Sequence, residues 1–232
     1  MMTMELLYEG KAKKVFKTNN PEEYMIEYKD DATAFNGVKK SEIAGKGVLN
    51  NKISSVIFEL LEKNGVETHY IKQVSEREML VKKVEIVALE VIIRNTIAGS
   101  LSKRLGIEEG LKLEKPLLEL CYKNDDLGDP FITEDHVEIL DLVDTEGLDK
   151  IKSMALKVNE VLKGYFLDKG INLVDFKLEF GYSKDGIVLA DEISPDTCRL
   201  WDVNTGEKLD KDRFRRDMGG LIEAYENVVG RL

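Results

Sequence analysis

Residues 173–181 read LVDFKLEFG, and this stretch decides the fold around which the rest of the chain is organised. Side chains alternate between the two faces of a strand, so its apolar and charged residues lie on opposite faces. The apolar face carries Phe176, Leu178 and Phe180, and the charged face carries Asp175, Lys177 and Glu179. The charges recur about every 6.6 Å in the order minus, plus, minus. The pattern predicts a strand with one face in the core, while its charged face fits either a solvated surface or a binding site.

A second strand is predicted at 187–193, directly after the turn that follows the first strand. If the loop has three residues, with Gly186 in a left-handed conformation, Asp191 lies opposite Glu179. A two-residue loop would instead place Glu192 opposite Glu179. Two directly opposed carboxylates repel one another, and a divalent cation commonly relieves that repulsion. Either register therefore predicts an acidic pair suited to a metal ion.

The composition is that of a globular protein with an acidic surplus. The chain has 232 residues, 43% of them hydrophobic, with 44 acids against 34 bases and a formal charge of -10. This length suits one large or two small domains with a substantial core. The acidic balance argues against duplex nucleic acid and against an anionic membrane as the main partner. It does not exclude small anionic substrates.

The acidic surplus is concentrated in one segment. Residues 125–149 contain ten acids and no Lys or Arg, a pattern that favours a solvated face or loop. The rest of the chain is balanced, with 34 acids and 34 bases. A cleft elsewhere can therefore be locally positive. The basic residues expected in it are Lys11, Lys13, Lys82, Arg94, Lys177 and Arg199.

Cysteine and histidine usage points away from disulfide and zinc chemistry. Cys121 and Cys198 form no CxxC pattern, which favours a reducing, cytoplasmic location. His69 and His136 lie far apart in the sequence and form no HExxH motif. The first residues, MMTMELLYEGKAKK, lack the apolar run of a signal peptide, so none is expected. The most apolar stretch, 86–93, is interrupted by Glu90, so no membrane span is expected either.

Local patterns predict an α+β protein in two lobes. Strands are predicted at 6–8, 14–16, 24–28, 68–74, 77–86 and 89–97. Helices are predicted around 53–61, at 100–106, at about 148–168 and from about Asp212 onward. Strands dominate the first third, and helices alternate with strands afterwards. We place a β lobe at residues 1–82 and a larger α+β lobe at 83–232.

Two basic segments could bind phosphate. Residues 10–13 read GKAK, a turn whose backbone N–H groups and lysines could lie over a polyphosphate. No GxxxxGK[ST] or GxGxxG motif occurs, so a solvated lysine turn also explains it. Arg94 precedes a short helix beginning near Ser100, where a phosphate monoester could dock. Simple helix capping is the alternative for Ser100.

The turn at 194–199 follows the second acidic strand and ends in Arg199. Arg199 could point back toward whatever the charged strand face holds, or it could pair with Asp196 or Asp202. Cys198 is interpreted as a packing residue, because no histidine near it in the sequence could activate it as a nucleophile.

Motifs along nearly the whole chain resemble the phosphoribosylaminoimidazole-succinocarboxamide synthase (SAICAR synthetase) family. They are YEGKAKKVF at 8–16, DDATAFNG at 30–37, GVLNNK at 47–52, LVKKVEIVALEVIIRNTIAGSL at 80–101, LVDFKLEFG at 173–181, LADEISPDTCRLWD at 189–202 and DKDRFRRDMGG at 210–220. Two positions depart from the family: Ala88 stands where proline is usual, and Asn36 stands where some members carry aspartate.

The resemblance implies a fold akin to ATP-grasp enzymes and protein kinases, and a magnesium- and ATP-dependent ligase. Such an enzyme joins the carboxylate of carboxyaminoimidazole ribonucleotide (CAIR) to L-aspartate, giving SAICAR, ADP and phosphate, and the family implies a homodimer. Carried over by motif, the nucleotide residues are Lys11, Ala12, Lys13, Val15, Lys82, Ile86 and Lys123, and the magnesium ligands are Glu179 and Asp191. The ribonucleotide residues are Arg94, Ser100 and Arg199, with Asp175, Lys177 and Asp196 around the reacting centre.

The chemistry agrees with this residue set. A carboxylate forms an amide only after it acquires a leaving group, and ATP most simply supplies an acyl phosphate. Phosphoryl transfer needs positioning and charge neutralisation more than a protein nucleophile. Asp175 or Asp196 is the candidate base for the attacking amine. A kinase-like phosphotransferase and a nucleotide-binding regulatory module with a structural acidic pair are the two alternative functions.

Overall fold

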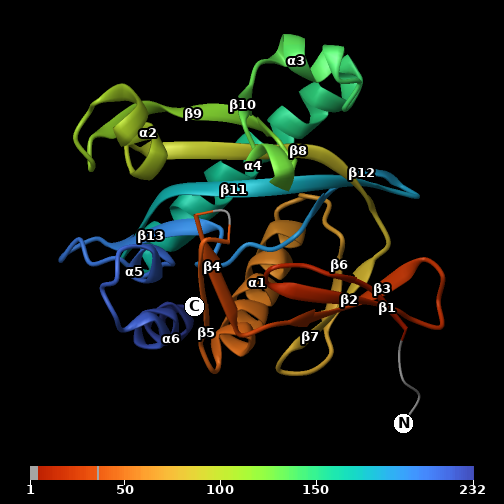
Figure 1. Cartoon of the computed structure of the whole chain (residues 1–232), viewed down its shortest axis with the longest axis horizontal. Coiled ribbons are helices and arrows are strands. Elements are labelled where there is room, and N and C mark those ends of the chain that lie inside the picture. Colours follow the sequence, from red (N-terminus) through yellow and green to blue (C-terminus); the bar gives the residue numbers. More distant parts are fainter. Residues whose placement is uncertain (1–4, 36) are drawn as a thin grey trace.

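The computed structural model describes residues 5–35 and 37–232 and contains two large antiparallel sheets (Figure 1). The first sheet has the order β1-β2-β3-β7-β6. Its strands are β1 (Leu6–Glu9), β2 (Lys13–Lys17), β3 (Glu23–Tyr28), β7 (Glu78–Lys82) and β6 (Tyr70–Gln73). A separate hairpin follows β3 and consists of β4 (Asp31–Ala34) and β5 (Lys39–Glu42). Helix α1 (Lys46–Lys63) packs against the first sheet through Phe58, which stacks on Tyr70 with ring centroids 5.8 Å apart.

The second sheet has the order β10-β9-β8-β11-β12, with β13 also pairing with β11. Its strands are β8 (Glu85–Thr96), β9 (Lys112–Tyr122), β10 (Phe131–Ile132), β11 (Ile171–Ser183), β12 (Gly186–Ala190) and β13 (Cys198–Asp202). The helices of this part are α2 (Gly99–Leu105), the 3-10 turn η1 (Asp125–Leu127), α3 (Glu134–Ile139), α4 (Thr145–Asp168), α5 (Asp212–Arg215) and α6 (Leu221–Arg231). None of the described helices is long and apolar enough to cross a membrane.

Strand β11 lies at the centre of the second sheet, as the stretch at 173–181 predicts. It pairs with β8 along one edge and with β12 and β13 along the other. Phe176, Leu178 and Phe180 are buried in the main core, where α4 packs against β11. The opposite face carries the charged residues. The predicted alternation of apolar and charged residues along β11 is therefore confirmed. The predicted fold class, a two-lobed α+β protein, is confirmed by the mixture of helices with two antiparallel sheets.

Both predicted registers for the acidic pair are wrong. Glu179 pairs with Ala190, because the two-residue loop consists of Lys184 and Asp185, and Ser183 already pairs with Gly186. Both predicted registers placed Gly186 within the loop, so each was displaced along β12. Strand β12 ends at Ala190, and Asp191 takes a left-handed conformation with φ 61°. Asp191 therefore starts the loop that leads to β13 and is not a ladder residue of the strand.

The predicted C-terminal helix is also wrong as a single element. Helix α5 ends at Arg215, and α6 begins only at Leu221. Between them Gly219 and Gly220 have φ angles of 70° and 62°, which a continuous right-handed helix does not permit. In the acidic segment at 125–149, nine of the ten acids are exposed and Asp129 is half-buried, as expected of a solvated face.

Two linkages join the sheets. Strand β7 ends at Lys82 and β8 begins at Glu85, so the chain passes from one sheet to the other over two residues. Residues 67–69 also pair with the end of β12: His69 N donates to the Leu189 carbonyl at 2.8 Å, and Leu189 N donates to the Glu67 carbonyl at 3.0 Å. The face of β11 that carries Lys177 is thereby held close to the first sheet.

We expect the apolar face of β11 to carry much of the stability. Leu178 is 1% exposed, so Leu178→Ala should lower the free energy of unfolding by about 2–5 kcal/mol. Leu167 on α4 is 56% exposed, and the same substitution there should change it by less than about 0.5 kcal/mol. Urea unfolding of both variants measures the difference. Equal losses would contradict the central place of β11 in the core.

Candidate functional site

A cavity of about 520 Å³ is bounded by the first sheet, β8, β11 and the loop after β12. It contains all seven residues predicted to bind nucleotide: Lys11, Ala12, Lys13, Val15, Lys82, Ile86 and Lys123. Lys177, Glu179, Asp191 and Asp196 line its other side. Residues as far apart in the sequence as Lys11 and Asp196 thus meet in one cavity, because the turn between β1 and β2 faces the charged side of β11.

A smaller cavity of about 180 Å³ adjoins the first. Arg94, Ser100, Asp175 and Arg199 line it, together with Arg215 from the end of α5. Lys177, Asp196 and Thr197 line both cavities, so the two spaces meet at these three residues. Every residue predicted from the sequence for the site therefore lines one cavity or both.

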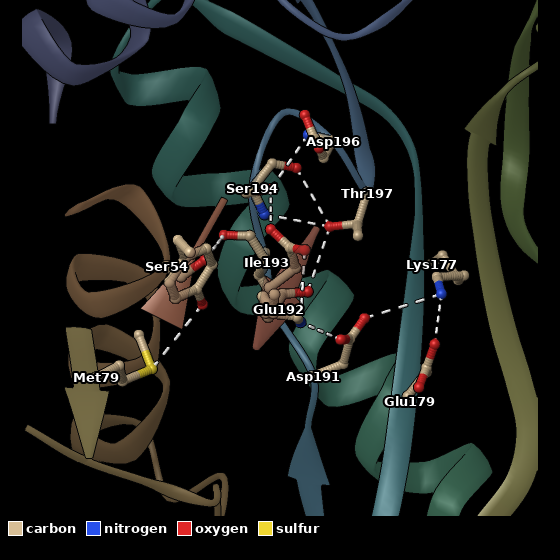
Figure 2. Close-up of polar contacts among 12 residues, drawn as sticks. Ser54, Met79, Lys177, Glu179, Asp191, Glu192, Ile193, Ser194, Asp196 and Thr197 are labelled. Carbon is tan, nitrogen blue, oxygen red and sulfur yellow. Dashed lines mark hydrogen bonds and ion pairs between the residues drawn. The ribbon is translucent and has the colours of Figure 1, made fainter. Parts of the chain in front are cut away.

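The boundary between the cavities is built around the Lys177 ammonium. Strand pairing places Glu90 of β8 directly opposite Glu179. Lys177 Nζ lies 2.8 Å from Glu90 Oε1, 2.5 Å from Glu179 Oε1 and 3.8 Å from Asp191 Oδ2. Figure 2 shows the Glu179 and Asp191 carboxylates both turned toward this ammonium. Glu90 was not predicted for the site; its only signal in the sequence is an acid within an apolar strand.

Asp191 and Glu192 form a second set of ion pairs with the first sheet. Lys13 Nζ bonds to Asp191 Oδ1 and lies 3.4 Å from Glu192 Oε1. Burial alone would lower the pKa of Lys13, but the two carboxylates outweigh it and hold that pKa above its ordinary value. Burial would raise the pKa of Asp191, yet Lys13 and Lys177 hold it below its ordinary value. Lys13 and Asp191 are therefore both charged at neutral pH.

Glu179 and Asp191 have the chemistry of magnesium ligands. Magnesium at a nucleotide site is usually held by one or two carboxylates together with phosphate oxygens. Both carboxylates lie against the same ammonium, so a cation that took the place of the ammonium would meet oxygen donors from both residues. Within the described residues no three His, Cys, Asp or Glu side chains converge on a closed metal centre. The donor set fits a cation that is completed by phosphate oxygens.

In the smaller cavity Asp175 holds two arginines in place. Arg94 Nη1 donates to Asp175 Oδ2 at 2.9 Å, and Arg199 Nη1 donates to both Asp175 oxygens at 3.1 and 2.9 Å. Arg199 Nε donates to Asp212 Oδ2 at 3.0 Å, so the alternative pairing of Arg199 with Asp196 or Asp202 does not occur. Gly99 allows this approach: a Cβ there would overlap the Arg199 guanidinium.

Ser100 bonds to Arg94 and does not cap the helix. Arg94 Nη2 lies 3.1 Å from Ser100 Oγ, and Ala98 occupies the N-cap position of α2. The capping alternative is therefore wrong. Cys198 is buried, and burial raises the pKa of its thiol, which is the opposite of what a nucleophile requires.

Asp196 lies at the boundary of the two cavities, with both oxygens occupied. Lys46 Nζ lies 2.7 Å and Lys211 Nζ 3.4 Å from Oδ2, and the Tyr225 hydroxyl donates to Oδ1 at 2.6 Å. Burial would raise the pKa of Asp196, but Lys211 and Lys46 hold it well below its ordinary value. None of these three partners was predicted, because nothing around Lys46, Lys211 or Tyr225 in the sequence indicates that they meet Asp196.

Two further lysines lie at the mouth of the larger cavity. Lys123 Nζ is 3.2 Å from Glu179 Oε1, and Lys11 Nζ is 2.7 Å from Asp125 Oδ1. Ala88, one of the two departures from the family, lies in β8 and its carbonyl accepts the Lys123 N–H at 3.1 Å. The other departure, Asn36, lies outside the described residues.

His69 lies in the wall of the larger cavity and is buried. Its ring meets Phe58 edge to face, with centroids 5.3 Å apart. Burial and the nearby Lys13 ammonium lower the pKa of His69 to about 3. His69 is therefore neutral at physiological pH. The other histidine, His136, lies on the surface.

The paired sheets and the lysine- and carboxylate-lined cavity define an enzyme with an ATP-grasp-like fold. The chain belongs to the SAICAR synthetase family, whose model matches residues 6–232. The chain is 63% identical over 232 residues to the phosphoribosylaminoimidazole-succinocarboxamide synthase of Caldanaerobacter subterraneus subsp. tengcongensis. This match covers 100% of the chain and 99% of that protein. The resemblance that the motifs indicate is thus confirmed.

Solved structures agree with this assignment. The enzyme of the same name from Ehrlichia chaffeensis superimposes with a TM-score of 0.96 at 47% identity, over 98% of each chain. A type-2 SAICAR synthetase in complex with ADP gives a TM-score of 0.94 at 52% identity, over 98% of this chain and 97% of that one.

The neutral His69 predicts a pH-dependent stability. Its pKa in the folded state lies below the unfolded value of about 6.5, so its contribution is present above that pH and is lost as the pH falls. Between pH 7 and pH 5 the free energy of unfolding should fall by about 2 kcal/mol more in the unsubstituted protein than in His69→Gln. Urea unfolding across this range measures the slopes, with the exposed His136→Gln as the control. Parallel curves for the unsubstituted protein and His69→Gln would contradict a buried neutral imidazole.

Proposed function

We propose that the protein joins the carboxylate of CAIR to the amino group of L-aspartate, with ATP converted to ADP and phosphate, in purine biosynthesis. The observation that carries this proposal is the meeting of two cavities at Lys177, Asp196 and Thr197. The larger one offers lysines and carboxylates suited to a polyphosphate, and the smaller one offers two arginines suited to a phosphate monoester. The names of the relatives, and the ADP complex of one of them, support the same reaction.

The larger cavity is the proposed ATP site. Lys11, Lys13 and Lys123 would contact the phosphates, since their ammonium groups surround the carboxylates of β11 and of the following loop. Val15 and Ile86 would pack against the adenine. Lys82 donates to the Thr68 carbonyl at 3.0 Å and borders the same wall, as does Ala12.

Glu179 and Asp191 would hold the magnesium ion that accompanies ATP. The bound ion would neutralise charge on the transferring phosphoryl group. In the structure the Lys177 ammonium balances these two carboxylates. Lys177 lies on the boundary of the cavities, where it can also face the carboxylate of the ribonucleotide that is to be activated.

The smaller cavity is the proposed CAIR site. Arg94 and Arg199 are oriented by Asp175 and would bind the ribonucleotide phosphate together with Ser100. Because both guanidinium groups are held by buried carboxylates, little side-chain freedom is lost when the substrate binds. Arginine also offers paired donors that match phosphate oxygens.

The reaction follows from these positions. A CAIR carboxylate oxygen attacks the γ-phosphorus of ATP, the bond from that phosphorus to the β,γ-bridging oxygen breaks, and ADP leaves. The aspartate amine then attacks the acyl carbon, loses a proton and displaces inorganic phosphate. No protein nucleophile is needed.

Asp175 and Asp196, the two candidate bases, have both oxygens engaged by cations or a hydroxyl. A carboxylate held in this way is a poor proton acceptor. The geometry therefore favours a positioning role for both at the reacting centre, with proton abstraction left to another acceptor.

Three further properties complete the proposal. We place the lobe boundary at residues 82 and 83, between β7 and β8. The homodimer stays a prediction from the family. The cytoplasmic location stays a prediction from the two free cysteines and the proposed reaction.

The reaction can be tested directly with purified protein, ATP, magnesium chloride and CAIR. ADP should form when L-aspartate is added and should fall to the background rate without it. ADP release that continues unchanged without aspartate would favour the kinase-like alternative and would overturn the ligase. Protection by ATP against thermal unfolding without any turnover would favour the regulatory module.

We expect Asp191→Asn to lose catalysis far more than ribonucleotide binding. A neutral amide is a weaker magnesium ligand, so kcat should fall by about 100-fold or more, while the Kd for CAIR changes by less than about threefold. Asp185→Asn, in the exposed turn between β11 and β12, is the matched control. Equal losses in kcat and in CAIR affinity would instead place Asp191 in the ribonucleotide pocket.

A further inference from the structure

The Lys211 ammonium has unused hydrogen-bonding capacity inside the larger cavity. Its side chain is only 11% exposed and lines the cavity wall next to Asp196 and Thr197. An ammonium offers three donors. Among the described residues its sole partner is Asp196 Oδ2 at 3.4 Å, which is long for a hydrogen bond between charged groups. Lys211 is thus a largely buried cation with one long ion pair, to a carboxylate oxygen that it shares with Lys46.

Neighbouring carboxylates are already taken by other groups. Asp196 is held by Lys46 at 2.7 Å and by the Tyr225 hydroxyl at 2.6 Å. Glu192, the other buried acid beside the boundary, accepts from Ser194 Oγ at 2.7 Å and pairs with Lys13. Burial, together with the cations Lys46 and Arg215, lowers the pKa of Lys211 against the opposing effect of Asp196. A substrate anion would therefore relieve an unfavourable charge at this position.

Arg215 lines the smaller cavity, as Lys211 lines the larger one. Lys211 is the N-cap residue of the short helix α5 and Arg215 is its last residue, four positions later, and Arg215 is close enough to lower the pKa of Lys211. Arg215 Nη1 donates to Asp212 Oδ1 at 2.8 Å, and the side chain lines the smaller cavity. Lys211 and Arg215 thus border the two cavities from one wall.

The other cations of the two cavities already have assignments. Three lysines face the proposed polyphosphate, two arginines face the proposed ribonucleotide phosphate, Lys82 bonds to a backbone carbonyl and Lys177 bonds to acids. L-aspartate, the third substrate of the proposed reaction, has two carboxylates, and its amine must reach the boundary between the two cavities. Lys211 and Arg215 are the cavity-lining cations that remain.

We propose that Lys211 and Arg215 bind the two carboxylates of L-aspartate and present its amine to the activated carboxylate. This inference rests on the proposed function and deepens it by naming the recognition site of the amino acid. Two cations at a fixed separation select a dicarboxylate over amino acids with a neutral side chain. Lys46 and Asp196 then act as positioning residues that hold the Lys211 side of the pair.

Steady-state kinetics of Lys211→Met tests the proposal. The charge is lost while the chain length is kept, so the KM for aspartate should rise about 10- to 100-fold, as for the loss of a charged hydrogen bond. The KM values for CAIR and ATP should stay within about threefold. Lys211→Arg, which keeps the charge, should give an intermediate KM for aspartate. Lys208→Met is the matched control, because Lys208 is similarly buried but lies over the Trp201 ring outside both cavities.

Succinate, which has the two carboxylates but no amine, supplies an independent probe. It should inhibit the unsubstituted enzyme competitively with aspartate, and its inhibition constant should rise at least about tenfold in both Lys211→Met and Arg215→Gln. The second variant keeps the test available if the first does not fold.

Three results would overturn this assignment. One is an unchanged KM for aspartate in both variants of an active enzyme. Another is a rise in the KM for CAIR instead. The third is a loss of kcat at unchanged KM with a shifted pH profile, which would indicate proton transfer by Lys211. Failure of the proposed function itself is distinguishable, because the unsubstituted protein would then form no ADP in response to aspartate.

Discussion

The pairing of β8 with β11 places the Glu90 and Glu179 carboxylates directly opposite each other in a buried strand ladder, and the rest of the site depends on how that repulsion is relieved. Lys177, two residues along the same face, lies within 2.8 Å of both. Removing one partner of such a buried cluster would leave an uncompensated charge, at a cost of about 3–5 kcal/mol. The cluster extends through Asp191 to Lys13 of the first sheet, so the same ion pairs that hold the site together also join the two sheets.

The parts of the fold that could be predicted are those encoded by local periodicity. The alternation in β11 and the apolar stripe of α4 are both local patterns, and both elements form where the patterns occur. The register after β11 could not be predicted, since it depends on which residues form the turn, and in the structure they are Lys184 and Asp185, with Ser183 paired to Gly186. The sequence Lys184-Asp185-Gly186 fits a turn at more than one position. Likewise, two consecutive glycines interrupt the C-terminal helical pattern, and their φ angles become evident only in three dimensions.

The site residues divide in the same way. Most of the predicted residues lie within motifs, because short motifs fix both the residue type and its face on a strand or turn. Glu90 and Lys211 also lie within motifs but were missed, because a motif does not show which distant residue each one meets. The partners of Asp196 were missed, because Lys46 is 150 residues away in the sequence and lies in the first turn of a helix, an unfavourable place for a cation. A fully buried lysine there is understandable only once Asp196 is seen beside it. Glu90 was missed for the opposite reason: an acid in an apolar strand reads as an interruption until its cross-strand partner is known.

Net charge and local charge give different accounts of this protein. The surplus of acids lies at 125–149, almost entirely on the surface, whereas the cavities hold lysines and carboxylates already paired with one another. Such pairs can be exchanged without leaving a buried charge alone: phosphate oxygens can take over the ammonium groups while a divalent cation takes over the carboxylates. When both ligands bind, one ammonium–carboxylate pair is replaced by an ammonium–phosphate pair and a cation–carboxylate pair. Because an unpaired charge is costly at low dielectric, binding of the phosphate and binding of the cation are favoured to occur together. Nucleotide and metal ion would then bind to this cavity as a unit, and the ion pairs seen in the structure would be the resting form of the same site.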